Sequence, residues 1–362
     1  MKKNMTLKEI AERAGVTAAT VSYVINDSAR ISEKTKEKVM KVIEETGYQT
    51  NLIARGLRGG RTRLIGILAE DITVWHTSGI IDGINQAADE LGYNIILSNL
   101  RFNSKIGNRL EAVSKYKDDI DRAVNTLLSM QVDGIIYIAM HDRNVSNLIK
   151  NIKIPLVCCY CCSEDGKVPS IRYDNEESFY QLTCKLIQYG HRKLGIIKGP
   201  EDSEASNLRL KGFYRAIREH NITIPSEWDE TGDWTYQSGM EATVRMLSRK
   251  DEAGNTEILP EGERLDAVLA FNDEMATGVY NAAAKLGLRI PADLSVTGFD
   301  DWSISANMLP PLTTIDRPLK KMGQKALEFV TDVINGNNEK QASALVLPNR
   351  IIERESVRKS WT

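Results

Sequence analysis

The chain has 362 residues, of which 42% are hydrophobic and 27% are charged, and its formal net charge at pH 7 is −2. This length exceeds one ordinary hydrophobic core, so we expect two or three domains. The balanced charge argues against a protein that is basic throughout, which is the usual footprint of a nucleic-acid binder. The N-terminal residues are polar, and no run reaches the ~18–20 apolar residues of a membrane span. We therefore expect a cytoplasmic protein without a membrane segment.

The charge is unevenly distributed along the chain. Residues 1–63 contain seven lysines and six arginines against seven acidic residues, which gives this segment a net charge of +6. Residues 64–362 then carry a net charge of −8. A small basic segment before a larger acidic one is the pattern expected when only the first segment contacts a polyanion.

The first segment predicts three short helices. Thr6 and Glu9 form a capping box at the start of the first helix, which Gly15 ends, and the cap residues Thr17 and Ser32 open the second and third. Two short helices joined by a glycine turn and braced by a third make a helix-turn-helix unit. The second helix of such a unit lies in the DNA major groove. The alternative is a generic three-helix cap on an enzyme.

These motifs resemble the signature of LacI/GalR-family transcriptional regulators. The resemblance is carried by residues 6–17, 20–22 and 47–58, which read TLKEIAERAGVT, TVS and GYQTNLIARGLR. It implies a lambda-repressor-like, all-α helix-turn-helix domain over 1–48 and a hinge helix or linker over 49–63.

The resemblance assigns DNA contacts to individual residues. Ala18, Ala19 and Tyr23 occupy the base-reading positions of the second helix. Most family members have arginine where Tyr23 stands, so we expect this operator to differ from the common one. The residues that match backbone-contact positions are Thr17, Thr20, Ser22, Asn26, Arg30, Ser32, Thr35 and Asn51.

The hinge implies a second DNA contact, in the minor groove. By resemblance, Ala54, Arg55 and Leu57 belong to a short helix that forms on DNA, and Leu57 wedges between bases. The alternative is that Leu57 packs on the next domain. Thr50 stands where the family usually has proline, and without that fixed φ we expect a more flexible free hinge.

From residue 64 onward, apolar strands alternate with amphipathic helices. This alternation predicts an α/β protein with parallel sheets covered by helices on both faces. The segment resembles the two-lobed, type I periplasmic-binding-protein-like sensor domain of the same family, so 64–362 is the expected effector-binding domain. We place the first lobe at 64–173 and 302–336, and the second at 174–301 and 337–362.

Polar side chains directly after strands are the candidates for ligand contacts, because ligands of such sheets bind beyond the carboxyl ends of strands. We expect Arg209, Asn272 and Asp300 to bind an effector, with interlobe salt bridges as the alternative. Trp234 offers a flat face for a sugar ring. Asp273 is more simply the N-cap of a helix than a ligand contact.

Three further residues complete the predicted effector site. Trp75 and His76 stand in the family's first effector loop, where an Asn-Pro-Phe-like stretch is usual. Either is a candidate for stacking on the ligand, and the alternative is packing on their own lobe. Asp174 matches a commonly acidic position near the cleft.

Other constellations favour structural roles. On a strand, Cys158 and Cys162 would share one face and Cys159 and Cys161 the other, so the four sulfurs would not converge on a metal. We expect buried structural cysteines, with Cys161 and Cys162 as the candidates for reactivity. The four histidines are scattered, and no catalytic or phosphate-loop motif is present. We therefore predict no enzyme activity, no cofactor and no metal.

Two segments are longer than is usual in the family, 103–124 and 248–264. The second is rich in Asp, Glu, Gly, Asn and Pro and predicts a solvated loop. We assign no function to either.

The predicted function is repression of a carbohydrate-utilisation operon under the control of a small effector, a sugar or sugar phosphate. A homodimer would match pseudo-palindromic operator DNA. We expect a dimer because tetrameric family members carry an extra leucine-rich C-terminal helix. The alternatives are a purine or nucleoside corepressor, a catabolite regulator controlled by a phosphocarrier protein, and, remotely, a sugar-transforming enzyme with a DNA-binding head.

Overall fold

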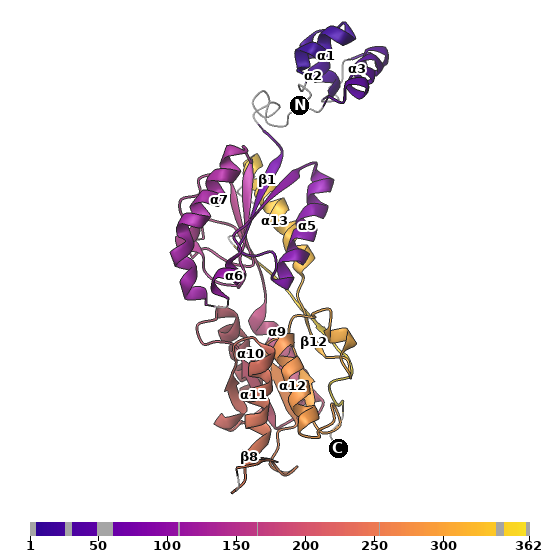
Figure 1. Ribbon diagram of the computed structural model, residues 1–362. Helices are drawn as coiled ribbons and strands as arrows, with labels where there is room; N and C mark the ends of the chain where they lie inside the picture. Colours follow the sequence, from indigo (N-terminus) through magenta and orange to yellow (C-terminus); the bar gives the residue numbers. More distant parts are fainter. Residues whose placement is uncertain are drawn as a thin grey trace. The chain divides into compact units, whose positions relative to one another are not determined.

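The computed structural model divides the chain into two compact units, Met1–Thr62 and Arg63–Thr362 (Figure 1). The residues that the structure describes are 5–25, 31–48, 61–107, 109–164, 166–252, 254–337 and 344–359. Within these ranges, no helix is both long enough and apolar enough to cross a membrane.

The described residues of the first unit form helices α1 (Leu7–Ala14), α2 (Ala18–Ile25) and α3 (Glu33–Thr46). Thr6 caps α1, and the side chain of Glu9 closes the predicted capping box. Gly15 follows α1 with a φ of 61°, a left-handed conformation that glycine adopts without steric cost. The apolar faces meet in a small core around Ile10, Val21 and Val39. The predicted helix-turn-helix fold is confirmed.

The second unit begins with a six-stranded sheet of order β13-β5-β4-β3-β1-β2, in which every pairing is parallel. Its strands are β1 (Leu64–Ala69), β2 (Asn94–Asn99), β3 (Gly134–Ile138), β4 (Leu156–Cys159), β5 (Ser170–Tyr173) and β13 (Ala344–Leu347). Helices α5 (Trp75–Leu91) and α13 (Leu319–Asn335) cover one face (Figure 1). The other face is covered by α6 (Phe102–Ile106), η1 (Leu110–Tyr116), α7 (Lys117–Ser129) and α8 (Ser146–Ile149).

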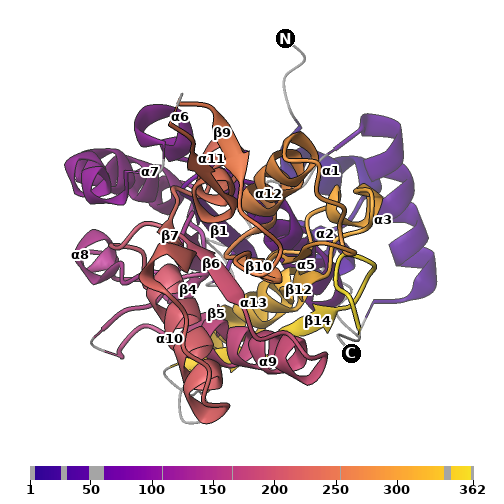
Figure 2. The ribbon, with the colours of Figure 1, turned by 90° about the horizontal axis from the view of Figure 1, so that it is seen from below.

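The second lobe has a four-stranded parallel sheet of order β11-β10-β6-β7. Its strands are β6 (Leu194–Lys198), β7 (Asp229–Thr231), β10 (Ala267–Ala270) and β11 (Ser295–Thr297). Figure 2 shows α9 (Asn175–Gln188) and α10 (Glu204–Glu219) on one side of it, and α11 (Tyr236–Leu247) and α12 (Asp273–Lys285) on the other. Short 3-10 helices are η2 (Ser226–Trp228) and η3 (Ser305–Asn307). The predicted α/β architecture with parallel sheets is confirmed.

The lobe limits predicted at 301 and 336 are wrong. The segment after β11 stays with the second lobe, since Thr297 bridges to Thr313 and Asp300 bridges to Asp316. It ends in β12 (Thr314–Asp316), which pairs with β14 (Arg350–Ile352). The last strand of the first sheet is β13, which lies beside β5, so the chain returns to the second lobe only after Leu347. Strand β13 reads ALVL, but its four residues are too few to show a clear strand period, and they are only partly buried.

The two longer segments have different structures. Residues 103–124 contribute to α6, η1 and α7. The second segment, predicted as a solvated loop, contains an antiparallel hairpin of β8 (Ser248–Lys250) and β9 (Thr256–Ile258). Its strand residues are largely exposed, as the polar composition indicates.

Candidate functional site

A cavity of about 350 Å³ lies between the two lobes of the second unit. Its wall combines the start of α5 and the segments after β3 and β4 with α10 and the segments after β7, β10 and β11. The structure brings six of the seven predicted effector residues into this wall: Trp75, His76, Arg209, Trp234, Asn272 and Asp300.

Asp174 is the exception among the predicted effector residues. It is the N-cap of α9, where its Oδ1 atom accepts a hydrogen bond of 2.9 Å from the backbone nitrogen of Glu177. Asp174 is not among the described residues that line the cavity. The Asp174 carboxylate therefore stabilises the first turn of α9, where unpaired backbone N–H groups favour a negative charge.

Arg209 projects from α10 and is almost fully buried, with 3% of its surface exposed. Its Nε atom donates to Asn175 (2.9 Å), and its Nη2 atom donates to the Tyr173 hydroxyl (3.2 Å). A third bond runs from Nη1 to the carbonyl of Phe271. The guanidinium also lies 3.5 Å from the centroid of the Phe299 ring. Arg209 is thus held rigidly, and all three of its acceptors are neutral.

Asn272 is the N-cap of α12, a role that the sequence had assigned to Asp273. Its Oδ1 atom accepts from the backbone nitrogen of Met275 (2.8 Å), and its Nδ2 atom donates to the carbonyl of Trp234 (2.9 Å). One N–H and one lone pair remain for a ligand. Asn272 therefore both starts a helix and fixes the backbone of Trp234.

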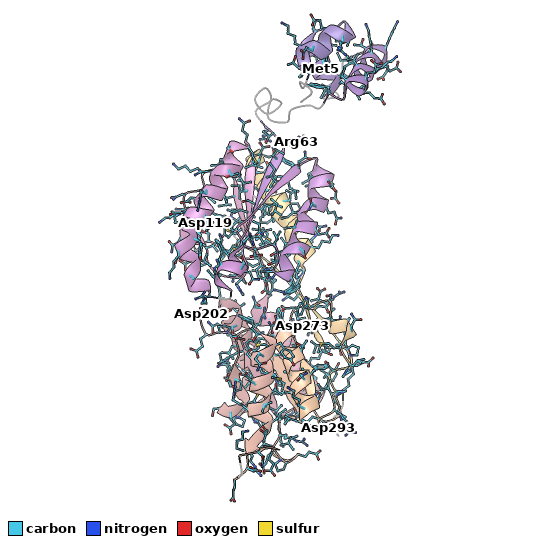
Figure 3. All side chains as sticks on the ribbon, in the orientation of Figure 1. Met5, Arg63, Asp119, Asp202, Asp273 and Asp293 are labelled. Carbon is cyan, nitrogen blue, oxygen red and sulfur yellow. The ribbon has the colours of Figure 1, made fainter. Side chains whose placement is uncertain are left out.

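Asp273 is buried in the second lobe and contacts the segment that follows β11. Its carboxylate accepts hydrogen bonds from the Trp302 backbone (2.8 Å), Ser305 (2.6 Å) and Thr314 (2.5 Å). Figure 3 labels it at the end of the second lobe nearest the first. Burial raises the pKa of Asp273 from its usual value. The residue anchors the loop that carries Asp300 and Trp302.

Two histidines on the first-lobe side of the cavity are neutral at pH 7. His76 stacks on Tyr160, with ring centroids 4.1 Å apart, and burial lowers the pKa of His76 well below its usual value. Burial, together with the charge of neighbouring Arg143, lowers the pKa of His141 to about 4. Both rings can therefore supply hydrogen bonds without charge.

The segment that carries His141 and Asp142 is tied down by Glu70, which lies directly after β1. Its carboxylate accepts from the Tyr137 hydroxyl (2.5 Å), the Met140 backbone (2.8 Å) and Arg143 (2.6 Å). The charged and hydrogen-bonded neighbours outweigh burial and lower the pKa of Glu70. This polar cluster determines where the loop after β3 meets the cavity.

Sequence reasoning missed Arg317, which lies at the crossing between lobes, directly after β12. Arg317 is 5% exposed and forms an ion pair of 2.9 Å with Asp300. It also donates to the Tyr160 hydroxyl and lies 4.4 Å from the centroid of the Trp75 ring. Burial raises the pKa of Asp300 to about 7, although Arg317 and Arg209 both act to lower it. The sequence offered one sign of this role, because Arg317 directly follows a strand, β12, where ligand-binding residues are expected.

Tyr160 lines the cavity because the chain turns at this residue, where φ is 63°. The turn also overturns the predicted cysteine faces: Cys158 and Cys161 share one core cluster, and Cys159 belongs to another. Burial raises the pKa of the Cys161 thiol, and it raises that of Cys162 to about 11. Both thiols are therefore protonated near neutral pH, which favours the expected structural role over the reactive alternative. Over the described residues, no His, Cys, Asp and Glu cluster suits a metal ion.

In the first unit, α2 presents two of its three predicted base-reading residues to solvent. Tyr23 is 54% exposed, and Ala19 is exposed beside it, whereas Ala18 packs partly on the core. Thr17 accepts from the backbone nitrogen of Thr20 (3.1 Å), and Ser32 caps α3. Ser22 and Thr35 are half-buried. The predicted contacts that lie outside the described residues are Asn26, Arg30, Asn51, Ala54, Arg55 and Leu57.

Comparisons with known proteins agree over nearly the whole chain. Residues 6–51 match the family of bacterial regulatory proteins, lacI family, and residues 184–357 match the periplasmic binding protein-like domain. The chain is 32% identical to the HTH-type transcriptional repressor PurR of Vibrio vulnificus, over 98% of this chain and 99% of that protein. It is 30% identical to catabolite control protein A of Priestia megaterium, over 98% and 100%.

A solved structure matches with similar coverage. The Lac repressor dimer bound to operator and the anti-inducer ONPF superposes with a TM-score of 0.77 at 29% identity, over 98% of this chain and 99% of that one.

Proposed function

The chain belongs to the LacI family of bacterial regulatory proteins, and from this membership we propose that it represses a carbohydrate-utilisation operon under the control of a small sugar-like effector. The proposed site of action is the cytoplasm, where the operator is. The family's members are transcriptional regulators, so the cavity is proposed as a sensing site and not a catalytic one.

The observation that carries this proposal is the convergence of Arg209, Asn272 and Asp300 on one cavity from three separate segments. Their donors and acceptors suit the hydroxyls of a sugar. Trp234 lines the same cavity and offers an aromatic face for the apolar side of a ring. The cavity volume of about 350 Å³ lies in the range of roughly 300–1,000 Å³ that is typical of small-ligand sites.

Two ion pairs join the lobes beside this cavity and give the effector a means of control. Arg172 of β5 pairs with Glu204 at the start of α10 (2.5 Å), and Arg317 pairs with Asp300 (2.9 Å). A ligand that favours one arrangement of the lobes shifts the population toward it, and operator affinity changes by the same coupling free energy. We propose that the hinge, 49–63, transmits this change.

The proposed DNA contacts follow from α2. Ala18, Ala19 and Tyr23 are the proposed base-reading residues, and the proposed homodimer places one such helix on each half of a pseudo-palindromic operator. Alanine methyl groups suit thymine C5-methyl groups better than a guanine edge. Leu57 remains the proposed minor-groove wedge.

A titration of the full-length protein against DNA from its own upstream region tests this function. Fluorescence anisotropy at several salt concentrations should give tight binding whose log–log slope is about −0.9 per phosphate neutralised. A slope near zero would contradict the phosphate-contact model. A thermal-shift screen of sugars should then find an effector, because a ligand of the native state raises its stability.

A purine or nucleoside corepressor is the second candidate. The aromatic rings of Trp75, Tyr160 and Trp302 in the cavity wall favour a planar ligand. The similarity to the repressor PurR of Vibrio vulnificus points the same way. Including hypoxanthine, guanine and adenosine in the thermal-shift screen decides between the two candidates.

A further inference from the structure

Arg317 has an unused hydrogen-bond donor inside the cavity. Two of its nitrogens are engaged, Nη1 by the Tyr160 hydroxyl and Nη2 by Asp300. Its Nε–H is buried and finds no acceptor within the described part of the chain. An unsatisfied buried donor destabilises the folded protein, and more so when the group is charged. A ligand oxygen at Nε would remove this cost.

Each carboxylate in the cavity wall already has a partner. The cavity wall contains three acids, of which Asp142 pairs with Arg172, and Asp300 pairs with Arg317. The third, Glu274, accepts from the backbone nitrogen of Tyr236 (3.4 Å).

Arg209 is the second guanidinium of the wall, and all its hydrogen bonds go to neutral atoms. Arg209 and Arg317 are buried, Asp300 is partly exposed, and both guanidiniums act electrostatically on this carboxylate. The three acids of the wall outnumber its two guanidiniums, so the wall carries no excess of positive charge. What it lacks is an acceptor for the buried Nε–H of Arg317.

We propose that Arg317 is a specificity-determining residue of the cavity, and that it selects effectors whose small ring carries an anionic oxygen group, a carboxylate or a phosphate. The inference rests on the proposed effector-binding function and narrows its ligand class. The anionic oxygen accepts from the free Nε–H of Arg317 and so satisfies this buried donor. Guanidinium nitrogens bind such groups through paired, charge-assisted hydrogen bonds.

The geometry also couples such a ligand to the lobes. Nη2 of Arg317 is the neighbour of Nε and already contacts Asp300 of the second lobe. A two-point contact along the Nε–Nη2 edge requires the ligand to share or replace this ion pair. The guanidinium meanwhile stays over Trp75 of the first lobe. Binding of the anion therefore changes the link between the lobes at the residue where the chain crosses.

The first test uses inorganic phosphate alone. Trp75, Trp234 and Trp302 line the cavity, so their fluorescence reports occupancy. At constant ionic strength, phosphate should change the emission of the wild-type protein in a saturable way, whereas chloride should not. Arg317→Gln should abolish this response. The matched control is Arg350→Gln, because Arg350 is an exposed arginine that pairs with Asp316, next to Arg317 in sequence. That control should retain the response.

The second test uses paired sugars: glucuronate and galacturonate for the carboxylate, and glucose 6-phosphate and fructose 1-phosphate for the phosphate, each with its neutral parent. At least one anionic member should bind the wild-type protein about tenfold more tightly than its parent, since charge-assisted bonds are roughly twice as strong as neutral ones. Arg317→Gln should bring this ratio close to one, and Arg317→Lys should restore part of it. The carboxylate and phosphate series distinguish the two sources of the anion.

Three results would overturn the proposal: no anionic probe binds, a neutral sugar or hypoxanthine binds as tightly as every anionic probe, or Arg317→Gln keeps the ratio. Because Arg317→Gln leaves Asp300 unpaired, the double variant Asp300→Asn/Arg317→Gln provides a second protein without the buried acid, and circular dichroism verifies that each variant is folded. Operator binding of the wild-type protein is measured in parallel. If the wild-type protein binds DNA but shows no anion preference, this inference alone is refuted, whereas absence of DNA binding refutes the proposed function.

Discussion

Arg143 and Glu70 form an ion pair of 2.6 Å in which the acid has no exposed surface. The same carboxylate accepts hydrogen bonds from Tyr137 and from the backbone of Met140. The pair therefore fixes the loop that brings His141 and Asp142 to the cavity. The ion pair therefore positions His141 and Asp142 at the cavity and also stabilises the folded protein.

Arg143→Ala should destabilise the protein by about 3–5 kcal/mol, because it leaves the Glu70 carboxylate buried without its counter-charge. Urea unfolding followed by circular dichroism measures the change. The control is Arg122→Ala, which removes an exposed arginine that pairs with Asp119 on α7 (Figure 3). Exposed pairs contribute little, so the control should unfold close to the wild-type midpoint. Equal effects of the two substitutions would refute the role of burial.

Gly199→Ala should move Trp234 out of its present position. A Cβ atom at residue 199 would lie 2.2 Å from the Cζ2 atom of the Trp234 ring, so the ring must shift. We expect a cost of about 1–3 kcal/mol from overpacking and a changed tryptophan emission. Gly262→Ala is the control, since a Cβ there meets nothing within 4 Å. An unchanged emission spectrum in Gly199→Ala would contradict the predicted displacement.

Tyr23→Ala should weaken operator binding without loss of stability, because the side chain is 54% exposed on α2. A direct base contact contributes about 1–3 kcal/mol of discrimination, so the preference for operator over random DNA should fall about tenfold or more. Anisotropy titrations with both DNAs give this ratio. Val21→Ala, which removes buried atoms from the same helix, should instead lower the melting temperature. If Tyr23→Ala weakens both DNAs equally, Tyr23 contacts only the backbone.

Asp300 should make stability depend on pH. Because burial raises its pKa to about 7 from the usual 3.8, the folded protein retains a proton that the unfolded chain releases. The stabilisation is therefore fully present below pH 3.8 and is lost as the pH rises through about 7. The difference in unfolding free energy between the wild-type protein and Asp300→Asn should decrease over this window. Parallel pH profiles of the two proteins would contradict the raised pKa.

Part of the cavity was predictable because Asn272 and Asp300 lie shortly after strands β10 and β11. Arg209 was also expected there, although it projects from within α10, and all three residues line the cavity. Arg317 was missed although it also follows a strand, β12. In sequence a buried arginine looks like a solvated one, and only the packing of Tyr160 and Trp75 around it distinguishes the two.

The errors have local physical causes. Asp174 was placed near the cleft, but its carboxylate caps α9 because the start of a helix has unpaired backbone N–H groups. The lobe limits were misplaced because β12 and β13 are only 3 and 4 residues long, too short to give a clear period. The prediction paired Cys161 with Cys159, but Cys161 shares a core cluster with Cys158. Strict alternation of side chains holds only while the strand continues, and β4 ends at Cys159.

The left-handed turn at Tyr160 fixes which side chains of this segment point into the interior and which one points into the cavity. Cys158, Cys159 and Cys161, before and after the turn, have buried side chains. The Tyr160 side chain, at the turn itself, lines the cavity. Insertion or deletion of one residue between 156 and 160 would exchange the positions of a cysteine side chain and of the Tyr160 ring. A cysteine sulfur would then contact Arg317, and the tyrosine ring would have to fit among packed apolar side chains. Changes of length in this short stretch should therefore disrupt sensing and folding together, whereas changes of side chain can affect one and spare the other.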